Sequence, residues 1–520
     1  MKRLPIGYAT LKDMIDNNCI YIDKTKFIAE LAKGSKCYFL SRPRRFGKSL
    51  IVDTLKQAFL GNKDLFKGLY LENNWDWQTT YPVIHISFGG GSAYDSKNNL
   101  LDNIMGTLEE HAKKYGVEFE NDKSYGYLFG RLIRGLYAKY QQQVVILIDE
   151  YDKPILDVIN NSEQAQVNRE ILKGLYGYIK DNDQYLKFVF ITGVSKFSKA
   201  GLFSGLNNLN DISLRSQYAD ICGYTQANIE NELAPYIKAG NVDLEKLEKL
   251  YNGYNFLGTE EQRVYNPFDL LLFCDNDYIY DCYWFKTGTP TFLIKLFEKN
   301  NYFIPEVLED PIVDATVLDT FDIDNIPILA LLFQSGYLTI KNKTTIGTDL
   351  AYVLTYPNHE VQSSLNKCLA QIGIPDSQNK SLLHLSNALK QNQLDELGNI
   401  FASHFASIPH NWYKSINNYE GFYASIVYSL LCGLGYDCIP EDISNIGRMD
   451  LTIKMPDKTI IIEFKLSDRG DATQALQQIK DRKYADKYLN LKLPIYIAGI
   501  SFDPKTKNLA DYKWESIEVK

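Results

Sequence analysis

Residues 37–50 constrain what this 520-residue chain can fold into more than any other segment. The apolar run Cys-Tyr-Phe-Leu leads into Ser-Arg-Pro-Arg-Arg-Phe-Gly-Lys-Ser, and an amphipathic stretch follows. A buried strand, a loop ending in Gly-Lys-Ser and a helix are the context of a phosphate-binding loop (P-loop). Gly47 lets the backbone approach closely, and the amide groups at the helix N-terminus bind phosphate. The common form of this loop has a glycine six residues before the lysine, where this chain has Arg42.

A second motif, Val144-Val-Ile-Leu-Ile-Asp-Glu150, is a continuous apolar run that ends in two carboxylates. Such a run is typical of a central strand covered on both faces. In a Walker B pattern, Asp149 joins the shell of Mg²⁺ and Glu150 orients the attacking water. The alternative is a buried strand that merely ends in a solvated acidic pair. The Gly-Lys-Ser loop upstream favours the nucleotide site.

A third apolar run ends at Thr192, followed by Ser195, where P-loop ATPases place a γ-phosphate sensor; an ordinary polar loop is the alternative. Arg44, Arg45 and Arg215 are candidates for phosphate contacts, against the alternative of solvated surface charge. We predict that Lys48 reaches the β- and γ-phosphates of ATP, and that Mg²⁺ is held by Ser49 and Asp149. The predicted nucleotide contacts are Arg44, Arg45, Phe46, Gly47, Lys48, Ser49, Leu50, Asp149 and Thr192, with Glu150 as the catalytic residue.

Short apolar runs and longer amphipathic stretches alternate through the first part of the chain. This order predicts a mainly parallel sheet with helices on both faces, an α/β fold. The predicted strands are residues 37–40, 83–88, 144–148 and 188–192, and the predicted helices are residues 49–60, 98–114, 127–140 and 167–179.

From about residue 225 the pattern becomes helical and less regular. Residues 326–333 predict a helix, and a hairpin follows that would end near residue 354, as in a small winged-helix-like or lid module. The last part of the chain predicts a separate α/β unit. Its helices are residues 419–434 and 473–488, and its strands are residues 449–453, 459–466 and 494–500.

Two strand-like runs of this last part carry a separate set of polar residues. Glu463 and Lys465 lie two residues apart, so they share one face of a strand that Asp450 on the adjacent strand can meet. The carboxylates of Asp450 and Glu463 and the carbonyl of Phe464 would form a hard oxygen site for Mg²⁺, with Mn²⁺ as the alternative. Such a metal activates water at a phosphodiester, and Lys465 would orient or deprotonate the nucleophile. The alternative is a structural ion pair between Glu463 and Lys465.

Several motifs resemble the bacterial AAA-ATPase-like family. They are Tyr21-Ile-Asp-Lys-Thr-Lys-Phe27, Arg42-Pro-Arg-Arg-Phe-Gly-Lys-Ser49, Ile148-Asp-Glu-Tyr-Asp-Lys-Pro154 and Thr192-Gly-Val-Ser-Lys-Phe197. Further matches at residues 284–290, 333–338 and 356–361 extend the resemblance over most of the chain. Because the family's loop has the Arg-Pro-Arg-Arg-Phe-Gly-Lys-Ser form, the resemblance makes Arg42 expected.

Members of this family commonly carry a C-terminal PD-(D/E)xK nuclease-superfamily domain. The resemblance therefore implies catalytic roles for Asp450, Glu463 and Lys465. Glu420 matches an acidic position near the metal of that superfamily, and Gln478 matches a catalytic position on a helix. The predicted organisation is an AAA-like P-loop ATPase domain (1–225), a helical lid and winged-helix-like region (226–400) and a restriction-endonuclease-like α/β domain (401–520).

The composition excludes several other classes. Hydrophobic residues make up 45% and charged residues 23% of the chain, as in ordinary globular proteins. No stretch approaches the roughly 20 apolar residues of a membrane span, and no apolar run of a signal peptide follows the first residues. We therefore expect a cytoplasmic protein with no membrane partner. The eight cysteines are scattered without a C-x-x-C pair, which argues against a zinc site or a disulfide framework.

The formal net charge of −8 argues against a surface that coats nucleic acid but leaves room for a local basic groove. Lys480, Arg482, Lys483 and Lys487 form such a basic side on a predicted helix, and a solvated helix face explains them equally well. The oligomeric state is open, with a homo-oligomer among the alternatives.

Two function hypotheses follow from these motifs. The leading one is an ATPase coupled to a Mg²⁺-dependent nuclease-like domain that acts on DNA, or on RNA as the second choice. The alternative is a non-cleaving ATP-dependent switch whose C-terminal domain only binds a nucleic-acid or protein partner, since a fold does not guarantee its chemistry. A transporter-coupled ATPase is poorly supported, because no membrane element or signature helix is visible.

Overall fold

The structure is a computed structural model of the chain. It describes residues 1–90, 93–118, 124–197, 202–203, 206, 208–286, 310–318, 327–370, 380–406 and 420–517. These residues form two compact units. The first unit contains the described residues up to 286 together with residues 310–358, and the second contains those from residue 359 onward. None of the helices in the described ranges combines the length and the apolar character needed to cross a membrane.

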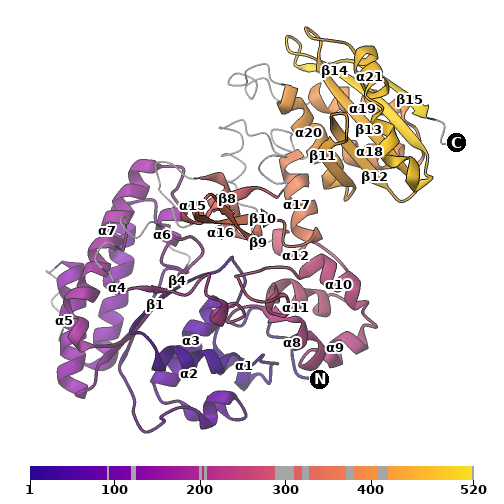
Figure 1. The fold of residues 1–520 in the computed structure, drawn as a ribbon. Coiled ribbons are helices and arrows are strands. Elements are labelled where there is room, and N and C mark those ends of the chain that lie inside the picture. Colours follow the sequence, from indigo (N-terminus) through magenta and orange to yellow (C-terminus); the bar gives the residue numbers. More distant parts are fainter. Residues whose placement is uncertain are drawn as a thin grey trace. The chain divides into compact units, whose positions relative to one another are not determined.

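A parallel five-stranded sheet with the order β2-β3-β4-β1-β5 is the core of the first unit. All residues of β3 are buried, as its apolar run predicts. Helices α4, α5 and α7 pack together on one side of the sheet, and α1 to α3 lie on the other side (Figure 1). The strands are β1 (Cys37–Ser41), β2 (Val83–Ser87), β3 (Val144–Asp149), β4 (Leu186–Gly193) and β5 (Asn210–Asp211). The helices are α1 (Leu11–Asp16), α2 (Thr25–Lys33), α3 (Lys48–Phe59), α4 (Lys97–Tyr115), α5 (Tyr125–Tyr140), α6 (Lys153–Leu156) and α7 (Ser162–Asp181).

The predicted parallel α/β fold is thus confirmed. The four predicted strands and four predicted helices all form, and their ends shift by a few residues. The strands β1, β4 and β3 are neighbours and run parallel, so their carboxyl ends lie at the same edge of the sheet. This edge holds both the loop after β1 and the acidic pair at the end of β3.

A mostly helical part follows the sheet. Its buried core includes Leu233, Leu247, Tyr251, Leu270 and Phe273. The elements are β6 (Tyr224–Thr225), α8 (Gln226–Asn231), α9 (Ala234–Ala239), α10 (Leu244–Tyr251), β7 (Val264–Tyr265), α11 (Pro267–Asp275) and α12 (Tyr283–Lys286).

The remainder of the first unit is a small module of two helices and a three-stranded sheet, which we call the α16 module (residues 310–318 and 327–358). The predicted helix and hairpin are both present as α16, β9 and β10, although residue 326 lies outside the described residues. That this module has a winged-helix-like fold stays a prediction. The elements are β8 (Ile312–Asp314), α15 (Ala315–Leu318), α16 (Ile328–Ser335), β9 (Thr339–Ile346) and β10 (Asp349–Thr355).

The second unit is built on a mixed five-stranded sheet with the order β11-β12-β13-β14-β15. Only β13 and β14 are parallel, and α21 connects them. The strands are β11 (Asp437–Ile443), β12 (Arg448–Met455), β13 (Lys458–Leu466), β14 (Ile495–Asp503) and β15 (Asn508–Ile517). The helices are α17 (His359–Ala370), α18 (Lys380–Lys390), α19 (Asp395–Ala406), α20 (Glu420–Gly433) and α21 (Ala472–Asp481).

The predicted helix 473–488 is interrupted in the structure. It ends as α21 at Asp481, and a 3₁₀ segment, η8 (Tyr484–Leu491), continues after Lys483. Lys483 has φ 45°, a left-handed conformation that ends an α-helix.

The described helices α17 to α19 belong with the C-terminal sheet, and the α16 module belongs with the P-loop sheet. The two compact units divide the described chain after residue 358. The predicted domain boundaries at residues 225 and 400 stay predictions.

Candidate active sites

The P-loop connects β1 to α3. Gly47 precedes the first residue of α3 and has φ 87°, which an L side chain rarely adopts. A Cβ added at Gly47 would meet no described atom within 4 Å, so the space beside this residue is open to a ligand. The amide groups of the first turn of α3, which begins at Lys48, point into this space.

Lys48 is buried, and its ammonium group is occupied by the loop itself. Its Nζ donates hydrogen bonds of 2.9 Å to the carbonyl oxygens of Arg42 and Pro43. Burial lowers the pKa of Lys48, and the negative charge of Asp149 opposes this shift. The structure therefore holds the lysine beside the loop and close to the acidic pair of β3.

Arg42 does not point toward the phosphate site. Its side chain is only 1% exposed, and it donates to the carbonyl oxygens of Ser41, Ser213 and Tyr218 at 2.7 to 2.9 Å. Its guanidinium group lies 3.8 Å from the ring centre of Phe256, and burial lowers its pKa to about 10. Arg42 thus ties the start of the loop to neighbouring segments, a role that the glycine of the common pattern cannot have.

The other loop residues divide between buried and exposed positions. Phe46 packs edge-on against Tyr254, with ring centres 4.8 Å apart, while the side chains of Arg44 and Arg45 are exposed. The carbonyl oxygen of Arg44 accepts hydrogen bonds from Asn266 Nδ2 at 3.4 Å and from Trp284 Nε1 at 3.3 Å. Sequence reasoning missed Asn266, although Trp284 opens one of the motifs that carry the family resemblance.

The acidic pair lies at the end of β3, next to the P-loop. Burial raises the pKa of Asp149, against a hydrogen bond from Ser49 and the charge of Lys48. Burial and the charge of Asp149 raise the pKa of Glu150, whose φ is 53°. A Cβ at Gly89 would lie 3.1 Å from Glu150 Oε2, so the carboxylate fills the space beside that glycine. The structure therefore brings Lys48, Ser49, Asp149 and Glu150 together.

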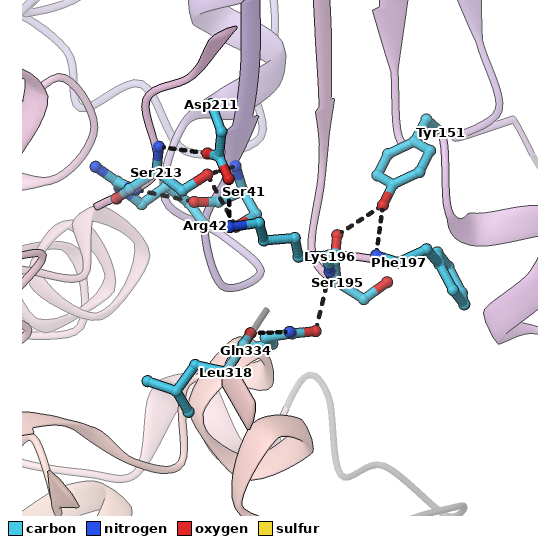
Figure 2. A network of polar contacts seen from close by, with 10 residues as sticks. All are labelled: Ser41, Arg42, Tyr151, Ser195, Lys196, Phe197, Asp211, Ser213, Leu318 and Gln334. Atoms are coloured by element: carbon cyan, nitrogen blue, oxygen red, sulfur yellow. Dashed lines mark hydrogen bonds and ion pairs between the residues drawn. The ribbon is translucent and has the colours of Figure 1, made fainter. Parts of the chain in front are cut away.

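The hydroxyl groups after β4 are used inside the protein. The buried Thr192 donates to the carbonyl oxygen of Leu40 at 2.9 Å, and Ser195 donates to Asp152 Oδ2 at 2.6 Å. Tyr151 donates to the carbonyl oxygen of Ser195 at 3.0 Å (Figure 2). Asp152 and Tyr151 hold this loop and were missed as site residues, although both lie in the motif at residues 148–154. The contact of Thr192 with nucleotide stays a prediction.

In the second unit, β12 and β13 place the predicted carboxylates side by side. Asp450 Oδ2 accepts a 2.7 Å hydrogen bond from the amide of Phe464, and the pairing of Leu451 with Ile462 sets this register. Glu463 is 2% exposed, and its Oε1 contacts Lys465 Nζ at 3.4 Å and accepts a hydrogen bond from Gln478. Two of the predicted catalytic residues, Lys465 and Gln478, therefore contact the same carboxylate.

Charge and burial both shift the pKa values of the carboxylates at this site. Burial, followed by the negative charge of Asp450, raises the pKa of Glu463 to about 8, against the charge of Lys465. Burial also raises the pKa of Asp450. Glu420, the first residue of α20, has its pKa raised by burial and by the charge of Asp450, and a hydrogen bond from the Leu466 amide opposes this. Glu420 thus lies close enough to Asp450 for the two charges to interact.

The residues present fit a divalent cation. Glu463 Oε2 is buried and has no hydrogen-bond partner among the described residues. An orphaned carboxylate oxygen next to a second desolvated carboxylate favours a bound cation. Within the described part of the chain, no three His, Cys, Asp or Glu side chains are grouped closely enough to hold a metal. Asp450 and Glu463 are the two carboxylates that fit such an ion, and the Phe464 carbonyl and Glu420 as ligands stay predictions.

The basic side predicted beside this site is partly neutralised. Lys480 pairs with Glu515 at 2.7 Å, and Lys487 pairs with Asp442. Arg482 donates to a loop carbonyl at 3.4 Å, and Lys483 is exposed. Two of these four cations thus form ion pairs within the second unit, and a basic side that binds a phosphate backbone stays a prediction.

The raised pKa of Glu463 predicts how stability depends on pH. Because the folded protein binds this proton more tightly than the unfolded chain, the free energy of unfolding falls as pH rises from about 4.5 to about 8. Glu463→Gln removes this loss, so the free energy of unfolding of the variant should exceed that of the metal-free wild type by several kcal/mol at pH 9 and by little at pH 4.5. Thermal unfolding in EDTA across this range measures the difference; equal slopes in both proteins would contradict it.

The comparisons with known proteins agree with this geometry. Residues 5–203 match the family described as "Predicted AAA-ATPase", and residues 418–512 match the "PD-(D/E)XK nuclease superfamily". A protein of Azotobacter chroococcum mcd 1, described as "Uncharacterized protein in vnfD 5'region", is 42% identical over 521 residues, which is 99% of each chain.

Proposed function

The chain belongs to the family of predicted AAA-ATPases that carry a C-terminal PD-(D/E)XK nuclease-superfamily domain, and we propose that it hydrolyses ATP in its first unit and cleaves a nucleic acid in its second. DNA is the proposed substrate, with RNA as the second choice. One observation carries each half. Lys48 and Ser49 meet Asp149 and Glu150 at one edge of the parallel sheet. In the second unit, Glu463 offers a buried oxygen without a partner among the described residues.

In the ATPase site, Lys48 would leave the loop carbonyls and bind the β- and γ-phosphates. Ser49 and Asp149, which already share a hydrogen bond, would hold Mg²⁺. Glu150 would orient the water, and its raised pKa makes it a stronger base than an exposed carboxylate. The remaining nucleotide contacts that we propose are Arg44, Arg45, Phe46, Gly47, Leu50 and Thr192.

In the nuclease-like site, a Mg²⁺ or Mn²⁺ ion would supply Lewis-acid stabilisation of the phosphodiester and an acidified water. Asp450, Glu463 and the Phe464 carbonyl would hold this ion. The ammonium of Lys465, which already contacts Glu463, would orient the nucleophile. Gln478 fixes the Glu463 carboxylate from α21, because its amide donates to Oε1.

Assays on purified full-length protein test both halves. ATP turnover and cleavage of single- and double-stranded DNA and RNA are measured with Mg²⁺ or Mn²⁺, with and without ATP. Lys48→Ala should lose ATP binding, because no other side chain of the loop places an ammonium beside the acidic pair. If no nucleic acid is cleaved under any condition, the proposed nuclease activity is wrong. The proposed ATPase activity is judged separately, by the ATP turnover assay.

The alternative is an ATP-dependent switch whose second unit binds its partner without cleaving it. Three of the charged groups beside the site serve internal ion pairs or a loop hydrogen bond, which is the observation that favours it. Calorimetry separates the two functions. No uptake of Mn²⁺ or Mg²⁺ that depends on Asp450 and Glu463 would favour the switch. A cytoplasmic location and a homo-oligomer stay predictions, and light scattering with and without ATP measures the latter.

A further inference from the structure

The C-terminal end of α16 contacts the loop that follows β4. Gln334 is 5% exposed, and its side-chain oxygen accepts a 2.9 Å hydrogen bond from the backbone amide of Lys196. Its side-chain nitrogen donates to the carbonyl oxygen of Leu318 at 2.8 Å. One side chain of the α16 module thus connects the β4 loop (residues 193–197) to α15 (Figure 2).

The same loop is held from the Walker B side. Asp152 Oδ2 accepts hydrogen bonds from the amides of Val194 and Ser195, at 3.0 and 2.6 Å, and from the Ser195 hydroxyl. Asp152 lies two residues after Glu150, the proposed water-orienting group. A Cβ at Gly193 would lie 2.4 Å from Asp152 Oδ1, so the loop approaches the acidic segment as closely as a glycine allows. The β4 loop therefore bridges the acidic segment and α16.

An ion pair holds Lys196, the lysine of the β4 loop. The ammonium of Lys196 lies 2.5 Å from Asp211 Oδ2, and both side chains are mostly buried. Burial alone would raise the pKa of Asp211, but the charge of Lys196 and hydrogen bonds with Ser213 bring it below its usual value. Ser213 also contacts the P-loop, because its carbonyl oxygen accepts a hydrogen bond from Arg42 (Figure 2). The β4 loop and the P-loop thus share one anchoring segment.

Just beyond Gln334, the α16 module also contacts the P-loop. Gly336 has φ 92°, and a Cβ there would lie 2.7 Å from Pro43. The ring of Tyr337 lies 5.2 Å from that of Trp284, which donates to the Arg44 carbonyl. Gln334 and Gly336, which lie in a motif that carries the family resemblance, therefore contact the β4 loop and the P-loop respectively.

A pocket lies beside this junction, and Ser41, Arg42, Lys196, Phe256, Leu318 and Gln334 are among its lining residues. A buried hydrogen-bonding group that loses its partner costs free energy. Loss of the bond between Gln334 and the Lys196 amide would therefore weaken the contact between the β4 loop and α16.

We propose that Gln334 is a positioning residue for ATP hydrolysis. By holding the Lys196 amide, it fixes the β4 loop against Asp152 and so keeps Glu150 aligned, and turnover then depends on the docked α16 module. This inference rests on the proposed ATPase function. Small displacements of a catalytic group lower rates steeply, whereas nucleotide binding through the P-loop needs no contact from Gln334. The effect should therefore appear in kcat and not in the affinity for nucleotide.

The test compares Gln334→Met, Gln334→Glu and Ser335→Ala in the full-length protein. Methionine keeps the volume but cannot accept the Lys196 hydrogen bond, so kcat should fall about tenfold with an unchanged Kd for ADP. Glutamate still accepts that bond but cannot donate to the Leu318 carbonyl, so it should keep more of the turnover than methionine. Among the described residues, the Ser335 hydroxyl bonds only within its own helix, to the carbonyl oxygens of Leu331 and Leu332, so Ser335→Ala is the matched control.

Hydrogen exchange adds a readout that turnover does not give. In Gln334→Met the Lys196 amide should lose protection, while the amides of β1 and β3 keep theirs. Wild-type turnover in Gln334→Met, or equal losses in Gln334→Met and Gln334→Glu, would overturn the inference and leave the ATPase proposal intact. A wild-type protein that hydrolyses no ATP would overturn both.

Discussion

Glu150→Gln should lower kcat for ATP by about 100- to 1,000-fold while the Kd for ATP stays near the wild-type value. Glutamine has the same size and can adopt the same left-handed backbone, but it cannot accept a proton from water. The proposed phosphate contacts of Lys48 and of the P-loop amides do not involve Glu150, so binding should be retained. Steady-state turnover and fluorescence titration with a labelled nucleotide measure the two quantities separately.

Glu163→Gln is the matched control, because Glu163 is an exposed residue in the first turn of α7. It should change neither quantity. If Glu150→Gln turned over ATP at the wild-type rate, Glu150 would not be the water-orienting group. The neighbouring carboxylate of Asp152 would be no substitute, because its Oδ2 already accepts three hydrogen bonds from the β4 loop.

Asp450→Ala should abolish nucleic-acid cleavage, with a loss of at least about 1,000-fold, and should remove the divalent-cation uptake of the second unit. The change deletes one of two carboxylates in the proposed metal site and frees the Phe464 amide. Cleavage is measured on the best substrate of the panel, and cation uptake by calorimetry. ATP turnover in the same sample should be unchanged.

Asp486→Ala controls for the loss of a negative charge, because Asp486 is an exposed residue of η8. Cleavage that persists in Asp450→Ala would show that the activity arises elsewhere. A wild-type protein that cleaves no nucleic acid and shows no cation uptake dependent on Asp450 would support the binding-only switch.

The sequence predicted the strand, loop and helix around Gly47 and the run that ends at Asp149, because these signals are local. A continuous apolar strand, a glycine before a helix and a terminal acidic pair each act over a few residues. The same reasoning found β12 and β13 and placed Asp450 opposite the Glu463 strand.

Features that depend on distant partners were not predictable. Arg42 is held by Ser213, Tyr218 and Phe256, which the fold brings together from other segments. Gln334 contacts an amide far from it in sequence, and no local pattern marks that contact.

The edge strands of the second sheet were missed for a different reason. β11 contains a proline and charged residues, and in β15 the apolar side chains of Tyr512 and Trp514 alternate with charged ones over a short run. Such strands are defined by their neighbours in the sheet and carry a weak signal of their own.

The hydrogen bonds of Lys48 also have a kinetic consequence. Its ammonium group donates to two loop carbonyls, so the loop competes with the incoming phosphates for the same cation. The apparent affinity for ATP is then lower than the intrinsic affinity by the fraction of molecules in which the lysine is released. At high ATP concentration, the association rate would level off at the rate of that release. A nucleotide that lacks the outer phosphates gains nothing from the exchange, so the empty loop itself discriminates against it.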